Sequence, residues 1–287
     1  MSNAKEIRTQ IKSIQNTKKI TKAMEMVAAS KMRKAQSYME ESRPYAKKIK
    51  QVAADIAKAN TEVSHPFLVK NEKKNVGYIV VTTDRGLCGG LNINLFKKLI
   101  ASTKAHDEEG CNVSIAVYGT KGYKFLSGLG FHIVANKEGL GDQPGLNQLL
   151  GPIKVMVDSY REGKLDRIYL VSNIFENTMT QTPDISQLLP VPNFLETDTP
   201  NYGWDYIYEP SAEDLLETVL IRYIEALIKC AVSENIACEM AARMIAMKNA
   251  TDNAGTLIDE KQLQYNKARQ SAITQELSEI VAGAAAV

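Results

Sequence analysis

The sequence predicts an α/β domain inserted between two long terminal helices, and three observations carry this prediction. Glycine and proline gather in the middle of the chain: residues 77–203 hold 15 of the 17 glycines, and residues 66–210 hold eight of the nine prolines. Apolar residues follow helical spacing at both ends. Between the ends, short apolar runs alternate with helical stretches. We therefore expect three segments: residues 1–60, 61–210 and 211–287.

The first segment carries the pattern of a coiled-coil helix. Asn3 and Glu6 stand at capping-box spacing, which marks a helix start. From Ile7 on, positions separated alternately by four and three residues form a seam that is apolar near both ends and polar in between. The seam comprises Ile7, Ile11, Ile14, Lys18, Thr21, Glu25, Ala28, Met32, Ala35, Met39, Ser42, Ala46, Ile49, Ala53 and Ile56. Pro44 is expected to kink or divide the helix near Ser42, because proline lacks the backbone N–H.

The third segment predicts a second long helix. Its apolar residues repeat every four positions, so the apolar face spirals around the helix and can wrap a partner. The row comprises Leu216, Leu220, Ile224, Ile228, Val232, Ile236, Met240 and Met244. A helix from residue 211 to 281 would be roughly 105 Å long, which exceeds what a domain of this size can bury.

Charge favours pairing of the two ends. Residues 1–60 hold 14 basic and 5 acidic residues, a net charge of +9, whereas residues 211–287 hold 7 and 11, a net charge of −4. Opposite charges attract two helices that pack side by side. We therefore expect a long antiparallel coiled coil of the N- and C-terminal helices, with surplus positive charge left for an acidic partner.

The middle segment predicts a Rossmann-like α/β domain with a mainly parallel sheet. Strand-like runs lie at residues 76–83, 113–118, 131–135 and 167–172, and residues 178–189 are expected to add an antiparallel edge strand. The stretches between them are helix-like, for example residues 91–103 and 146–160.

Motifs for catalysis are scarce. The glycine-rich turn Asp84–Gly90 follows a strand and precedes a helix, where phosphate-binding loops occur, but it lacks both the GxGxxG spacing and a following Gly-Lys-Ser/Thr. Three scattered histidines and four cysteines without a CxxC pair predict neither a metal site nor a disulfide framework. No apolar run is long enough for a membrane span, and the polar, basic N-terminus lacks a signal core. We expect a non-catalytic chain without cofactor or metal.

Two other functions remain open at this point. The chain could be an α/β ligand-binding enzyme with a coiled-coil dimerisation arm, in which Gly86–Gly90 holds a phosphate. It could also be a nucleic-acid-binding coiled coil, because Lys18, Lys19, Lys22, Lys31, Arg33 and Lys34 form a basic run on one helix. We prefer docking of this run to an acidic protein surface, which leaves nucleic acid out of the expected partners.

Three blocks of residues resemble the gamma subunit of bacterial F-type ATP synthase, the central rotor shaft. Residues 14–31 are similar to the family's N-terminal helix, and Asp84–Leu91 to its strand-to-helix loop. At the other end, Ile273-Thr274, Glu276, Glu279 and Gly283-Ala284 fall at the spacing of its C-terminal signature. The blocks span the chain from end to end.

The resemblance implies a place in a rotary machine. The paired terminal helices would stand inside a hexamer of three alpha and three beta subunits, and the α/β domain would lie against the epsilon subunit and the membrane c-ring. Proton flow would turn the ring and the shaft, and the shaft's unequal faces would set the nucleotide affinities of the beta subunits. The complex would be peripheral at the cytoplasmic side of the cell inner membrane.

The resemblance also implies contact residues. Those expected to meet beta subunits are Lys18, Lys19, Lys22, Met24, Arg85, Cys88, Arg243, Arg269, Gln270 and Thr274. Those expected to meet epsilon and the c-ring are Trp204, Tyr206, Tyr208 and Glu209.

Overall fold

A computed structural model describes residues 4–59, 65–68, 75–191 and 212–285 of the chain. Its first and last elements are the long helices α1 (Ala4–Ala59) and α5 (Ala212–Ala285). The chain forms two compact units, and both helices contribute to each. Residues 1–29 and 243–287 form the helix-pair unit, and residues 30–242 form the domain unit.

In the helix-pair unit, α1 and α5 run antiparallel. The hydroxyl oxygens of Thr21 and Thr251 lie 2.8 Å apart, and the Lys18 ammonium lies 3.0 Å from where a Cβ on Gly255 would be. From the first pair to the second, the residue number falls along α1 and rises along α5, so the two helices are antiparallel. Seam positions of α1 such as Ile7, Ile11 and Ala28 are buried.

The domain unit contains a five-stranded sheet in the order β3-β2-β1-β4-β5. Its strands are β1 (Asn75–Val81), β2 (Asn112–Tyr118), β3 (Ile133–Lys137), β4 (Arg167–Phe175) and β5 (Gln181–Leu189). The first four are parallel, and β5 pairs antiparallel with β4 at the edge. This confirms the predicted α/β domain with a mainly parallel sheet and one antiparallel edge strand.

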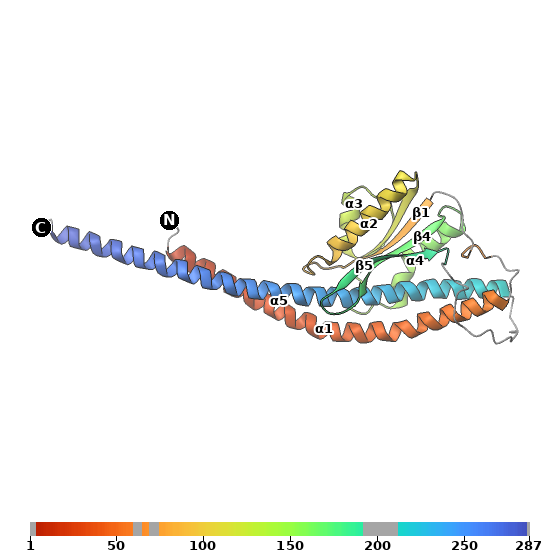
Figure 1. Ribbon diagram of the computed structural model, residues 1–287, viewed down its shortest axis with the longest axis horizontal. Helices are drawn as coiled ribbons and strands as arrows, with labels where there is room; N and C mark the ends of the chain where they lie inside the picture. Colours follow the sequence, from red (N-terminus) through yellow and green to blue (C-terminus); the bar gives the residue numbers. More distant parts are fainter. Residues whose placement is uncertain (1–3, 60–64, 69–74, 192–211, 286–287) are drawn as a thin grey trace. The chain divides into compact units, whose positions relative to one another are not determined.

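Helices cover both faces of the sheet (Figure 1). On one face, α2 (Leu91–Glu108) and α3 (Thr120–Gly128) pack on alternate residues of β1 such as Tyr78. On the other face lies α4 (Leu146–Arg161). The sequence analysis gave no bounds for α3, because its nine residues include two glycines and only one buried apolar side chain, which makes the helical signal weak.

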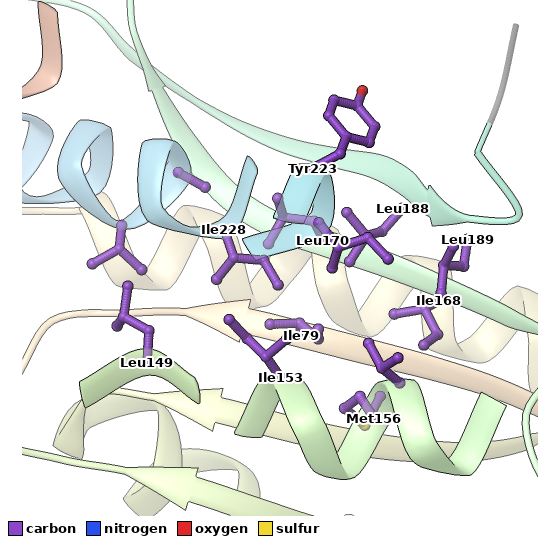
Figure 2. Packing of buried hydrophobic residues seen from close by; sticks show 14 of the residues in the cluster. Ile79, Leu149, Ile153, Met156, Ile168, Leu170, Leu188, Leu189, Tyr223 and Ile228 are labelled. Atoms are coloured by element: carbon purple, nitrogen blue, oxygen red, sulfur yellow. The ribbon is translucent and has the colours of Figure 1, made fainter. Parts of the chain in front are cut away.

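The main core of the domain unit joins α1, α4 and α5 to the sheet. Figure 2 shows Ile228 of α5 close to Ile79 of β1 and Ile153 of α4. The apolar row of α5 from residue 216 to 240 belongs to this core, as do Met39 and other seam positions of α1. The two predicted apolar patterns thus share one buried interior.

Pro44 corrects one expectation. The sequence analysis expected Pro44 to kink or divide the helix near Ser42; the helix is not divided, because α1 continues through Pro44 to Ala59. Both residues before this proline are held by polar contacts: the Ser42 hydroxyl donates to the Tyr38 carbonyl at 2.9 Å, and Arg43 forms an ion pair with Glu234 of α5. We infer that packing along α5 outweighs the loss of one backbone hydrogen bond.

The turn after β2 supplies a test of the fold. Gly119 has a positive φ of 97°, and a Cβ there would lie 2.4 Å from the Thr82 carbonyl oxygen. We expect Gly119→Ala to lower the free energy of unfolding by about 3 kcal/mol, because both the backbone angle and the contact become unfavourable. Urea unfolding of the full-length chain measures the change.

Gly128→Ala is the matched control. Gly128 is the exposed last residue of α3, and a Cβ there meets no atom within 4 Å. The same substitution should change the free energy of unfolding by less than about 1 kcal/mol, because neither the backbone angle nor a contact opposes it. Equal effects of the two substitutions would contradict the geometry of the Gly119 turn.

Candidate partner-contact surfaces

The α1 part of the helix-pair unit exposes a surface that is both basic and apolar. Lys18, Lys19 and Lys22 are exposed, and Ile20 between them is 60% exposed. The Lys22 ammonium forms an ion pair of 3.0 Å with Glu25, whereas Met24 is half-buried. This surface coincides with the polar interruption of the predicted seam. The apolar residues of this stretch, Ile20 and Met24, lie on α1 outside the seam positions.

The end of α5 is exposed on all sides. Every residue from 269 to 284 is exposed, including three of the predicted contact residues, Arg269, Gln270 and Thr274. The stretch also carries large apolar side chains in the open, among them Ile280 and Val281, which are 67% and 68% exposed. Burial among the described residues therefore does not explain why this stretch carries apolar residues.

Arg243 has a different environment from the other predicted contacts on α5. Its relative exposure is 8%, and it takes part in interactions within the chain. A direct contact between Arg243 and another protein would therefore use only a small part of its surface.

The loop after β1 is held in place by side chains. The Asp84 carboxylate accepts hydrogen bonds from the backbone N–H groups of Thr120, Gly139 and Leu140 at 3.0–3.1 Å. The Asn92 amide donates to the Thr83 hydroxyl at 2.7 Å. These bonds fix the loop against the turns that follow β2 and β3, so its shape is set by the chain itself.

The same loop has an inner and an outer side. Cys88, a predicted contact residue, is 3% exposed and packs with Leu91 and with Cys238 of α5. Arg85 lies on the outside, as does Leu87, which is 62% exposed with a positive φ of 63°. Sequence reasoning missed Leu87, although a leucine between glycine and cysteine in a turn could have drawn attention to it.

Burial governs the chemistry of the thiols on α5. Desolvation raises the pKa of Cys238 far above its ordinary value, and it raises that of Cys230 as well. Because the thiolate is the reactive form, both side chains stay protonated and unreactive at neutral pH. These two cysteines therefore have structural roles, and both thiols donate hydrogen bonds to backbone carbonyls, Cys230 to Ser42 and Cys238 to Asn173.

The expected ligand position of such a sheet is taken up by α5. In open α/β sheets, ligands bind beyond the carboxyl ends of the strands where the strand order reverses, here between β1 and β4. Near the carboxyl end of β4, the Asn173 amide donates to the side chain of Asn235 at 2.8 Å, and the Cys238 thiol lies 3.6 Å from the Asn173 carbonyl oxygen. Because α5 occupies this position, the geometry disfavours the alternative function in which the loop after β1 binds a phosphate.

Other predicted features fall outside the described residues or give no site within them. Trp204, Tyr206, Tyr208 and Glu209 lie outside the ranges that the structure describes. Within those ranges, no three His, Cys, Asp or Glu side chains gather closely enough to hold a metal ion. The described helices all fall short of the length and apolarity that a membrane crossing requires.

Comparisons with known proteins agree with this architecture. The ATP synthase family matches residues 3–287. A chain of the Euglena gracilis mitochondrial ATP synthase, in a structure of OSCP, F1 and c-ring, is similar with a TM-score of 0.69 and 20% identity over 99% of this chain and 94% of that one. A second Euglena gracilis structure, of the rotor, contains a chain with a TM-score of 0.63 and 21% identity over 94% and 98% of the two chains.

A third similar chain comes from the central stalk and c-ring of the Tetrahymena thermophila mitochondrial ATP synthase. Its TM-score is 0.59 and its identity 23%, over 80% of this chain and 99% of that one. The three structures show a shared fold at low sequence identity, and the family match covers nearly the whole length of the sequence. The chain therefore belongs to the ATP synthase family, as a gamma subunit.

Proposed function

We propose that this protein is the central-stalk rotor subunit of an F-type ATP synthase. It couples proton flow through a membrane c-ring to ATP synthesis or hydrolysis at the beta subunits by rotation, and it has no catalytic site of its own. The observation that carries the proposal is the family match over residues 3–287. The antiparallel pairing of α1 and α5, and the exposed end of α5, are its structural support.

Rotary coupling needs a shaft whose sides differ. A partner can shift the conformations of three equivalent beta subunits only through contacts that differ between them. The helix-pair unit has such sides: a basic and apolar one around Lys19 and Ile20 of α1, and another from residues 243–287, in which five basic and five acidic residues balance. Each beta subunit thus meets a different surface at each rotary position.

The contacts with beta follow from the exposed residues. Lys18, Lys19, Lys22 and Met24 meet an acidic element of beta, and Arg269, Gln270 and Thr274 meet loops deeper in the hexamer of alpha and beta subunits. In the loop after β1, Arg85 and Leu87 supply the outward contact, and Cys88 supports the loop from inside. Arg243 supports the helix pair in the same way.

The remaining proposals concern the assembly. Residues 1–60 and 211–287 act as the shaft and residues 61–210 as the domain that meets epsilon and the c-ring, with Trp204, Tyr206, Tyr208 and Glu209 as contacts. The shaft is a coiled coil, and the chain is of bacterial origin. The subunit reaches the cytoplasmic side of the cell inner membrane only through its complex.

Co-purification tests the proposal directly. A tagged chain should bring down alpha, beta and epsilon subunits in a 3:3:1 ratio with one copy of itself, together with the c-ring in mild detergent. Quantitative mass spectrometry of the purified complex gives these ratios. Recovery of the chain as a homodimer with bound nucleotide would instead favour the ligand-binding enzyme.

Removal of residues 271–287 tests the role of the exposed end of α5. These residues carry apolar side chains with no burial in the described chain, so their loss should leave the thermal unfolding midpoint of the isolated chain within about 2 °C of wild type. In the complex, proton pumping per ATP hydrolysed should fall, because the shaft has lost part of its bearing surface. A truncated chain that unfolds well below wild type and pumps normally would refute both expectations.

A further inference from the structure

One short stretch of α5 holds a group of polar contacts with the domain. Glu234, Asn235 and Cys238 lie within a little more than one helical turn, and all three bond to residues at the end of β4. Elsewhere along the domain, α5 presents mainly its apolar row, and its ion pair between Glu217 and Arg161 of α4 is half-exposed. The buried polar contacts between α5 and the sheet are thus concentrated at one level.

Glu234 connects three elements. Its carboxylate accepts a hydrogen bond of 2.9 Å from Arg43 of α1 and one of 3.1 Å from the backbone N–H of Phe175 in β4. The Arg43 side chain is half-exposed, so the ion pair by itself contributes little to stability. The shared carboxylate nevertheless requires α1, α5 and β4 to keep one relative position.

Asn235 and Cys238 add a buried part to this contact. Asn173 and Asn235 are 1% and 2% exposed, and their side chains bond to each other at 2.8 Å. The Oδ1 atom of Asn173 is buried without a hydrogen-bond partner among the described residues. A buried polar atom without a partner is unfavourable, so an apolar pair would give at least equal stability here.

Apolar contacts alone leave the register of α5 poorly defined. Leucine and isoleucine recur every four residues along the row. A shift of α5 by four residues, about 6 Å, would therefore place similar side chains at the same packing positions. The same shift would bury Glu234 and Asn235 without partners, at a cost of several kcal/mol. Buried polar residues are known to set register in this way.

We propose that Glu234, Asn235 and Cys238, with Asn173, Phe175 and Arg43, form a polar clasp that fixes the register and rotation of α5 and α1 on the α/β domain. The clasp makes the domain and its helices turn as one body under load. Its members are positioning residues. The functional part of this inference rests on the proposed rotor function, whereas the structural part does not.

A triple variant tests the clasp. Asn173→Leu, Glu234→Met and Asn235→Leu replace these three polar side chains with apolar ones of similar size, and they leave Cys238, Arg43 and the backbone N–H of Phe175 in place. Ile236→Leu, in the same helical turn and also buried, is the matched control because it alters packing and leaves the clasp intact.

Spin labels report the register of α5. One pair uses Thr218→Cys on α5 and Lys154→Cys on α4, and a second pair combines Thr218→Cys with Lys104→Cys on α2; all three positions are exposed. Cys111 and Cys230, which are partly exposed, are first replaced by alanine.

The distance distributions are measured by pulsed electron resonance on the full-length chain. We expect one narrow distance for wild type and Ile236→Leu, and a broadened or second distribution for the triple variant. Glu234→Gln, which keeps its shape and loses its charge, should fall between them and serves if the triple variant does not fold. Distributions for both variants that match those of Ile236→Leu would overturn the clasp.

Activity of the assembled complex adds a second readout. Proton pumping per ATP hydrolysed should fall at least two-fold in the triple variant, and ATP hydrolysis should continue. A wild-type chain that fails to assemble with alpha and beta subunits would refute the rotor function and leave the distance result standing. A loosened register with unchanged pumping would show that the clasp does not transmit torque.

Discussion

The structure depends on the burial of the apolar row of α5 against two partners at once. In the domain unit, residues from Leu216 to Met240 contact both the seam of α1 and the face of the sheet that α4 also covers. Each fully buried leucine or isoleucine contributes about 2 kcal/mol through removal of apolar surface from water. A row of such residues therefore outweighs local defects, and it keeps α1 helical through Pro44.

This shared core explains why the α/β domain has no open ligand-binding position at the carboxyl ends of its strands. A doubly wound sheet normally opens toward a ligand at the carboxyl ends of its strands. Here the loop after β1 turns Cys88 inward onto Cys238, and the end of β4 bonds to Asn235. The position that binds a cofactor in other proteins of this architecture here contacts α5. The α/β fold thus serves to hold that helix in place.

The two units differ in what they expose. In the domain unit, α5 is buried along one side by α1 and the sheet, whereas in the helix-pair unit its final residues are open in every direction and still carry Ile280 and Val281. Such a distribution fits a subunit whose ends are completed by other proteins. One helix thus has two distinct parts: it is attached to the domain near residue 234, and it is exposed beyond residue 268, where we propose contact with partners.

The sequence by itself determined the long terminal helices, their antiparallel pairing and the alternation of strands and helices between them, because each depends on a periodic pattern or on helix-breaking residues that can be counted along the chain. The seam positions and the apolar row were predicted residue by residue. The bounds of the short helix α3 were not predicted, because its nine residues include two glycines and only one buried apolar side chain. Only the tertiary structure decided that α1 passes Pro44 unbroken and that Cys88 and Arg243 face inward. It also revealed that Asn173 and Asn235 meet although 62 positions separate them in the sequence. These outcomes depend on contacts between distant residues, and no local pattern records the energy of such contacts.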